Sequence, residues 1–181
     1  MEVTFPGSEF PGFPRIELTL PEGWRRDVAA DAVIVGYDPA SPAHFRTNVV
    51  VTVTRTRGDL PVEVYARRFA EEAGQDPTFQ VYGESPIEVS GYPGVLRLQS
   101  RRPENLGYEV IQAQYLVLVP TTHAELSDLV QLHASAAVDA AEATMDKFRT
   151  MVSSLRATPW SPDGFEELGT PTSPDATSTG A

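Results

Sequence analysis

The fold is decided by three neighbouring stretches of alternating sequence: VLRLQS at 95–100, YEVIQAQYLVLV at 108–119 and ELSDLVQLHA at 125–134. Apolar side chains recur in each at about every second position, which is typical of a β-strand with one buried face. A fourth such stretch, 78–89, precedes them, and Pro or Gly residues lie between the stretches. This spacing predicts an antiparallel meander of four strands.

Two helices are predicted, one before and one after this meander. Asp59 and Pro61 are expected to act as helix cap and first-turn proline, apolar residues follow at helical spacing over 62–73, and Gly74 ends the helix. The second predicted helix covers about 135–156 and again carries one apolar stripe. Both helices are therefore amphipathic.

Three more strands are predicted ahead of the first helix, at 15–20, 32–37 and 48–57. The order of elements is then β-β-β-α-β-β-β-β-α. Each helix must bury its apolar stripe against the sheet. The sequence therefore predicts an α+β fold in which an antiparallel β-sheet is flanked by two amphipathic helices.

The two ends of the chain differ in composition from its middle. Residues 1–14 repeat Phe-Pro-Gly, which predicts an extended or turning arm. Residues 158–181 are rich in Pro, Ser and Thr and contain acidic but no basic side chains, which predicts a disordered acidic tail. One folded domain is expected over 15–157.

Charge and cysteine content exclude several classes of function. The chain has 181 residues with 25 acidic and 14 basic side chains, a net charge of −11. Nucleic acid is therefore not an expected partner. The absence of cysteine excludes disulfides, thiol catalysis and cysteine-bound metals. No stretch approaches the roughly 18 apolar residues of a membrane span, so no span is expected.

The remaining candidates for catalysis are weak. Three histidines, His44, His123 and His133, do not stand at metal-binding spacing. Ser127, Asp128 and His133 could be imagined as a triad, but adjacent strand residues point to opposite faces and no nucleophile elbow is present. No catalytic residue, metal site or cofactor is expected, and the protein is predicted not to be an enzyme.

A polar sheet face is the first candidate binding site. If the apolar residues of 95–100, 108–119 and 125–134 face one core, the polar residues between them gather on the opposite face. This face is either a solvated surface or a binding surface for a ligand or partner. Its predicted members are Arg97, Gln99, Gln112, Gln114, Gln131 and His133.

The second candidate lies in the acidic tail. Trp160, Phe165 and Leu168 stand among Ser, Thr, Pro and acidic residues, a pattern typical of a short linear motif for a protein partner. The alternative for Trp160 is that it folds back over the end of the last helix.

Several strings resemble the LpqN-type lipoprotein family of the PsbP-like fold. They are LPEGW at 20–24, VIVGYDP at 33–39, FRTNVVVTVTR at 45–55 and GYPGVLRL at 91–98. The resemblance extends over about 15–157 and implies an α/β/α sandwich. It also implies a non-enzymatic binding or accessory domain, because other PsbP-like proteins assist complexes or act as Eag-type chaperones for secreted effectors.

The expected function is a non-catalytic, protein-binding accessory or chaperone-like domain. A module that binds a small apolar ligand or lipid, of the cell envelope type, is the alternative. The family typically carries a secretion signal with a lipidated cysteine, and neither is readable in this sequence. We therefore expect a cytoplasmic protein unless translation starts upstream.

Overall fold

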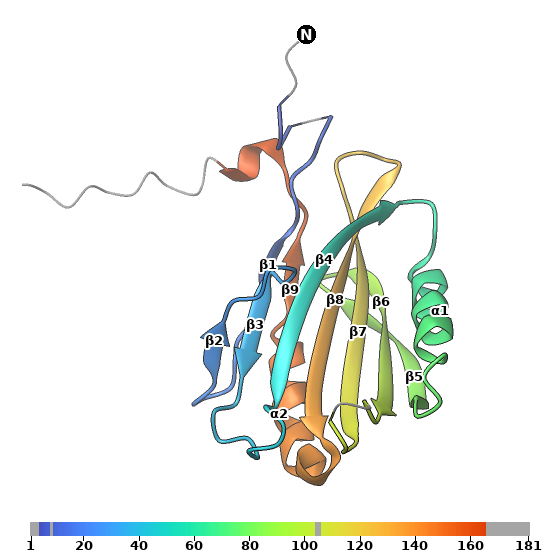
Figure 1. Ribbon diagram of the computed structural model, residues 1–181. Coiled ribbons are helices and arrows are strands. Elements are labelled where there is room, and N and C mark those ends of the chain that lie inside the picture. The colour runs from blue at the N-terminus through green and yellow to red at the C-terminus, as the bar shows by residue number, and fades with distance from the viewer. Residues whose placement is uncertain (1–3, 8, 104–105, 166–181) are drawn as a thin grey trace, which may run out of the picture.

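A seven-stranded antiparallel sheet forms the centre of the computed structural model, which describes residues 4–7, 9–103 and 106–165 (Figure 1). The strand order is β2-β3-β4-β8-β7-β6-β5. A small second sheet pairs β1 with β9. The strands are β1 Arg15–Glu17, β2 Arg25–Asp27, β3 Ile34–Tyr37, β4 Asn48–Arg57, β5 Gln80–Val89, β6 Tyr92–Arg101, β7 Val110–Pro120, β8 Leu126–Ala137 and β9 Arg156–Thr158.

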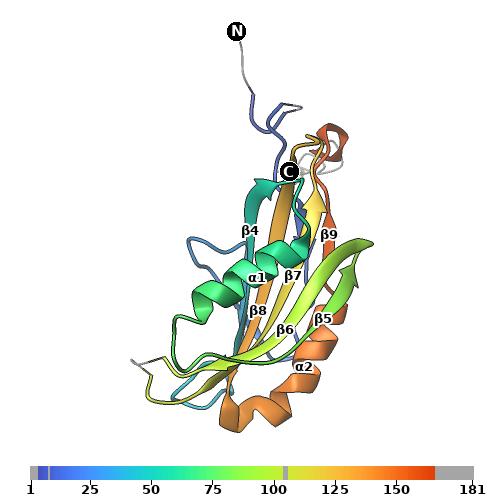
Figure 2. The same cartoon turned by 90° about the vertical axis from the view of Figure 1, so that its right-hand side faces the viewer.

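Two α-helices cover opposite faces of the large sheet (Figures 1 and 2). Helix α1, Val62–Ala73, packs over β6 and β7, and α2, Ala141–Ser153, packs on the other face. Two short 3₁₀ turns, η1 Val138–Ala140 and η2 Pro162–Phe165, complete the described elements. This arrangement confirms the predicted α+β sandwich.

Alternation along the central strands builds one core on each face. On β7, Leu116 packs beneath α1 with Val62 and Tyr65, whereas its neighbour Val117 belongs to the core beneath α2 with Phe148. All five side chains are at most 7% exposed. The period of two in the sequence therefore corresponds to two separate apolar layers.

The predicted helix over 135–156 begins too early. Strand β8 continues to Ala137, which pairs with Val110 of β7, and α2 starts only at Ala141. The spacing of Ala137, Ala141 and Phe148 fits a helix, but pairing with β7 gives the backbone of 135–137 its hydrogen bonds. Tertiary pairing overrides the local helical pattern here.

The predicted cap of α1 is also wrong. Asp59 accepts hydrogen bonds from Arg57 Nε at 3.0 Å and Nη2 at 2.7 Å, so its carboxylate is occupied by that guanidinium. Pro61 stands at the N-cap position, with no side-chain capping bond. The missing N–H of proline fits a position where the helix needs no donor.

Segments near both ends of the described chain pack on the domain. Arg55 donates to the main-chain oxygens of Pro11 at 2.5 Å and Gly12 at 2.9 Å, and its guanidinium also pairs with the buried carboxylate of Asp128. Trp160 is 9% exposed and lies against Gly12. The fold therefore continues past the predicted boundary at residue 157 as far as this indole.

Candidate functional site

All six residues of the predicted polar face lie on the sheet face that α1 partly covers. Cross-strand partners share a face. Arg97 of β6 pairs with Gln114 of β7, which pairs with His133 of β8. One row along, Gln99 pairs with Gln112. Gln131 pairs with Leu116, which packs beneath α1.

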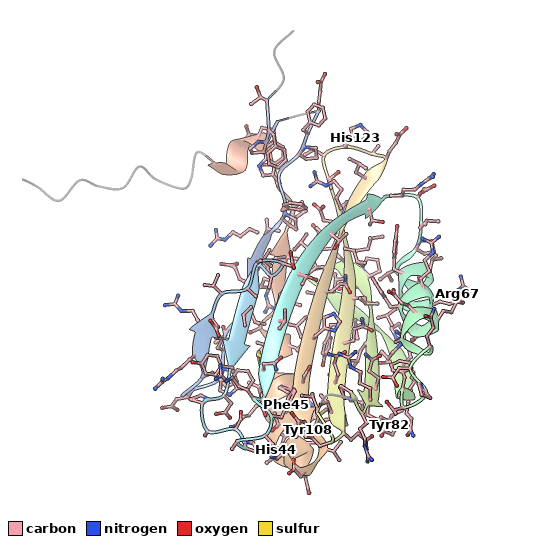
Figure 3. All side chains as sticks on the ribbon, in the orientation of Figure 1. His44, Phe45, Arg67, Tyr82, Tyr108 and His123 are labelled. Atoms are coloured by element: carbon pink, nitrogen blue, oxygen red, sulfur yellow. The ribbon has the colours of Figure 1, made fainter. Side chains whose placement is uncertain are left out.

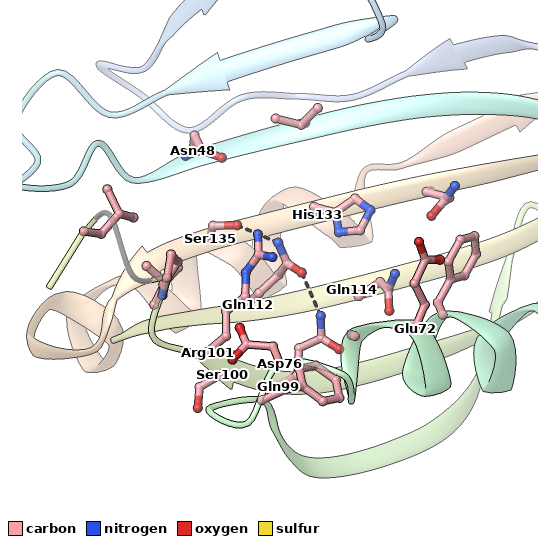
Figure 4. A pocket seen from close by; sticks show the side chains of 18 of the residues that line it. Asn48, Glu72, Asp76, Gln99, Ser100, Arg101, Gln112, Gln114, His133 and Ser135 are labelled. Atoms are coloured by element: carbon pink, nitrogen blue, oxygen red, sulfur yellow. Dashed lines mark hydrogen bonds between the residues drawn. The ribbon is translucent and has the colours of Figure 1, made fainter. Parts of the chain in front are cut away.

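Five of the six residues line a cleft of about 770 Å³ between this face and the C-terminal part of α1 (Figure 4). The loop after β6 and the segment before β4 form its other sides. The polar floor consists of Gln99, Gln112, Gln114, Gln131, His133, Ser135 and Asn48.

Arg97 is the exception, because its side chain is buried away from the cleft. It is 2% exposed and donates to Glu84 Oε2 at 2.7 and 3.0 Å, to the main-chain oxygen of Ala66 at 2.5 Å and to Gln114 Oε1 at 3.3 Å. The guanidinium thus connects β5, β7 and α1. We assign Arg97 a structural role in holding α1 over the sheet.

A chain of side-chain hydrogen bonds crosses the floor. Gln99 Nε2 donates to Gln112 Oε1 at 2.8 Å, and Gln112 Nε2 donates to Ser135 Oγ at 3.0 Å (Figure 4). Gln99 and Ser135 are 9% and 6% exposed. These strand-borne amides are therefore held in fixed positions.

Apart from Arg101, which lies on the same face of β6, the floor carries little charge at neutral pH. Burial lowers the pKa of His133 below its usual value, and the positive charge of Arg101 lowers it further. The imidazole of His133 and the side-chain amide of Gln131 make no hydrogen bond to any described residue. The floor thus offers uncharged donors and acceptors to whatever enters the cleft.

The walls are largely apolar and come from distant parts of the chain. Phe69 of α1, Phe79, Leu106 and Phe45 contribute apolar surface. Charged side chains also line the cleft: Glu72, Asp76 and Arg101.

One end of the cleft is closed where two loops meet. The Tyr108 hydroxyl donates to the main-chain oxygen of His44, and the Phe45 and Tyr108 rings meet edge to face with centroids 6.0 Å apart. Figure 3 shows His44, Phe45 and Tyr108 together at one end of the molecule. The aromatic side of the cleft could not be recognised from strand periodicity, because these residues lie in loops.

The imagined catalytic triad is not assembled. Asp128 is held by Arg55, and Ser127 and Asp128 lie on opposite faces of β8 as adjacent strand residues must. Over the described ranges, no group of three or more acidic or histidine side chains could hold a metal ion. No helix in this part of the chain is long and apolar enough to cross a membrane.

Trp160 is the one described residue of the predicted tail motif whose side chain can be placed. It is buried and packs against Gly12 of the N-terminal arm, whereas the alternative prediction places it over the end of the last helix. The side chain of Phe165 and all of Leu168 lie outside the described residues. The motif function of those two residues stays a prediction.

A comparison with known protein families shows to which family this chain belongs. The model of the family described as probable lipoprotein LpqN matches residues 7–158. The chain belongs to the LpqN family. This finding overturns the expected cytoplasmic location, because LpqN-family lipoproteins are proteins of the cell envelope.

Several solved structures share the fold of this chain. LpqN of Mycobacterium tuberculosis, described as involved in cell envelope biogenesis, is 22% identical, with a TM-score of 0.69 over 82% of this chain and 86% of that one. The cyanobacterial PsbP of Synechocystis sp. PCC 6803 is 14% identical, with a TM-score of 0.56 over 78% and 85% of the two chains. These likenesses confirm the predicted PsbP-like fold.

A third similar structure is a protein of unknown function from Pseudomonas aeruginosa, described as a putative regulator. It is 16% identical, with a TM-score of 0.53 over 78% of this chain and 94% of that one. No protein with a curated description matches the chain in sequence.

Proposed function

We propose that this LpqN-family protein is a non-catalytic binding protein of the cell envelope whose cleft holds a small, uncharged polar molecule with an apolar portion. The observation that carries the proposal is the composition of the cleft: amide and imidazole side chains on rigid strands form most of the floor, and the walls are mainly aromatic and aliphatic. The charged residues of its lining carry opposite signs: Arg101 against Glu72 and Asp76. Its volume of about 770 Å³ falls within the usual range for small-molecule sites.

The same geometry supports binding rather than catalysis. General acid–base chemistry needs two titratable groups in one site whose pKa values are driven apart. His133 is the one histidine among the described floor residues, and burial lowers its pKa. The carboxylates of Glu72 and Asp76 line the cleft but do not hydrogen-bond to it. A role in the cell envelope is supported by the relative from M. tuberculosis, which is described as involved in cell envelope biogenesis.

The test is a titration of the ¹⁵N-labelled protein with three six-carbon probes: hexanamide, hexanoate and hexylammonium. We expect hexanamide to shift the side-chain amide signals of Gln99, Gln112, Gln114 and Gln131 with a dissociation constant of about 1 mM, as befits eight heavy atoms. The two charged probes should bind more weakly, because the amides of the floor carry no opposite charge and Arg101 already lies near Asp76. Tighter binding of either charged probe, through Arg101 or through Glu72 and Asp76, would contradict this expectation.

A cleft-filling variant locates the binding. Gln131 is half-buried on the floor and makes no hydrogen bond to the described residues, so Gln131→Trp fills the cleft without breaking one. Gln80→Trp, at an exposed position of the edge strand β5, is the matched control. Hexanamide binding that survives Gln131→Trp, or shifts outside the cleft alone, contradicts the proposal.

A protein-binding function is the second candidate, and the N-terminal arm is the observation that favours it. Phe5, Phe10 and Phe13 are 65%, 47% and 50% exposed, although Arg55 holds the arm against the domain. Exposed aromatic side chains on a fixed segment are typical of interaction sites. A photoreactive residue in place of Phe10 should cross-link to one abundant partner in native cells, and a scatter of products contradicts this candidate.

A further inference from the structure

The amide of Gln99 has one polar atom with a protein partner and one without. Its Nε2 donates to Gln112 Oε1, whereas its Oε1 is buried and accepts no hydrogen bond from the described residues. The residue is 9% exposed and lines the cleft. A buried carbonyl oxygen without a donor has lost its hydrogen bond to water, so this position is destabilising in the empty protein.

The neighbouring hydrogen bonds agree with this direction of the amide. Gln112 accepts a hydrogen bond at Oε1 and donates one from Nε2 to the Ser135 hydroxyl. In this chain each side chain therefore donates to the next one in the direction from β6 to β8. Rotating the Gln99 amide alone would place its oxygen against Gln112 Oε1, which is also an acceptor. In the structure the oxygen lies on the side away from Gln112. The reversed chain, in which the Ser135 hydroxyl donates to Gln112 Oε1 and Gln112 Nε2 donates to Gln99, would leave Gln99 Nε2 without a partner instead, and such a cleft would favour ligands that carry acceptors only.

We propose that Gln99 Oε1 is the anchoring acceptor of the cleft and that the cleft selects ligands with an uncharged N–H or O–H donor on an apolar body. This inference rests on the proposed binding function and narrows it to one class of ligand. The oxygen is buried in the empty protein, so the Gln99 amide must turn towards the cleft before a ligand donor can give it the partner that it lacks. A ligand with acceptors only leaves the oxygen buried and unpaired, and a site built to hydrogen-bond rejects such analogues strongly.

Two probes of similar size separate these cases. Hexanamide carries an N–H donor, and methyl hexanoate carries acceptors only. We expect the wild-type protein to bind hexanamide about tenfold more tightly in an NMR titration, which corresponds to one hydrogen bond. Methyl hexanoate is the more apolar probe, so burial of apolar surface alone would give the opposite order.

The variant Gln99→Met keeps the length of the side chain and removes its acceptor. It should bring the ratio of the two dissociation constants to about one, mainly through weaker binding of hexanamide. Gln80→Met on the exposed edge of β5 is the matched control and should keep the tenfold ratio. The comparison of the two probes on the wild-type protein remains decisive if Gln99→Met does not fold.

The outcomes distinguish this inference from the function on which it rests. Equal binding of both probes in the cleft, tighter binding of methyl hexanoate, or a tenfold ratio that persists in Gln99→Met each overturns the role of Gln99. The proposed small-ligand function survives all three results. Cleft signals that respond to neither probe overturn both proposals.

Discussion

Arg97 Nη2 donates to the main-chain oxygen of Ala66 at 2.5 Å, so a guanidinium from the sheet is bonded to the middle of helix α1. The same nitrogen also contacts Glu84 Oε2 at 2.7 Å. The two partners of this ion pair are unequally buried, because the Arg97 side chain is 2% exposed and that of Glu84 is 44% exposed. Removing Glu84 and removing Arg97 should therefore lower the unfolding free energy by different amounts.

Loss of Glu84 should destabilise the protein more than loss of Arg97. Glu84→Ala leaves a buried guanidinium without its carboxylate, which should cost about 3 kcal/mol of unfolding free energy. Arg97→Met places an apolar chain in the same space, and Glu84 can turn to water, so we expect a loss of about 1 kcal/mol. Urea unfolding of both variants measures the order.

The control for this pair is Glu88→Ala, an exposed acidic residue of the same strand. It should change stability by no more than about 0.5 kcal/mol. If Arg97→Met proves the more damaging change, the guanidinium contributes more as a bridge to α1 than the ion pair explains.

Phe148 is the residue on which the α2 side of the fold most depends. It is 1% exposed and its ring meets Trp24 edge to face, with centroids 6.3 Å apart. Phe148→Ala should cost about 3 to 5 kcal/mol through lost transfer energy and the cavity left behind. The thermal midpoint should fall clearly, whereas Arg149→Ala, on the exposed side of α2, should leave it nearly unchanged. An unmoved midpoint in Phe148→Ala contradicts the packing described here.

The polar floor of the cleft could be predicted from the sequence because strand periodicity fixes which side chains share a face. Residues two apart on one strand must lie on the same side, so Gln112 and Gln114 had to gather together. Strand periodicity does not indicate which parts of the chain cover these glutamine side chains. The positions of Phe45 and Phe69 depend on how a loop and a helix pack from distant parts of the chain, and only the folded structure brings them to the cleft.

The burial of Arg97 and the end of β8 also could not be predicted from local sequence. Periodicity placed Arg97 on the correct face, but its burial depends on Glu84 of β5 and on a carbonyl of α1, which are partners that local sequence does not identify. The alanine-rich end of β8 fits either a helix or a strand, and pairing with β7 decides between them. Tertiary contacts thus settled what local patterns left undetermined.

The packing of Trp160 on the N-terminal arm predicts a specific coupling between two distant positions. A Cβ on Gly12 would lie 2.5 Å from Trp160 Cδ1, so Gly12→Ala must displace the indole. We expect Gly12→Ala to cost about 2 kcal/mol and Trp160→Ala about 3 kcal/mol in chemical unfolding. In the Trp160→Ala background the added methyl group should cost almost nothing.

The double variant is the decisive measurement in this cycle. If the double variant loses as much unfolding free energy as the two single variants together, Gly12 and Trp160 do not interact. That result would contradict the contact between them. Asp163→Ala, at an exposed position of η2, serves as the control for a change in the same segment and should leave stability unchanged.

His133 should make the protein less stable as the pH falls below about 6.5. Burial first, and then Arg101, lower the pKa of His133 in the folded protein below the value of about 6.5 expected when unfolded. The unfolded chain therefore takes up a proton more readily, so the contribution of this residue is complete above pH 6.5 and is lost as the pH falls towards the folded pKa. Asp38 and Asp76 have lowered pKa values as well, and their contributions are lost only at more acidic pH.

Replacing His133 with Gln isolates this effect, because glutamine keeps a polar side chain on the floor but does not titrate. Urea unfolding at pH 7.5, 6.0 and 5.0 should show that the wild-type protein loses more stability on acidification than His133→Gln does. The control His123→Gln retains His133 and should follow the wild-type curve. Parallel pH profiles for wild type and His133→Gln would mean that the imidazole is as easily protonated in the folded cleft as in the unfolded chain.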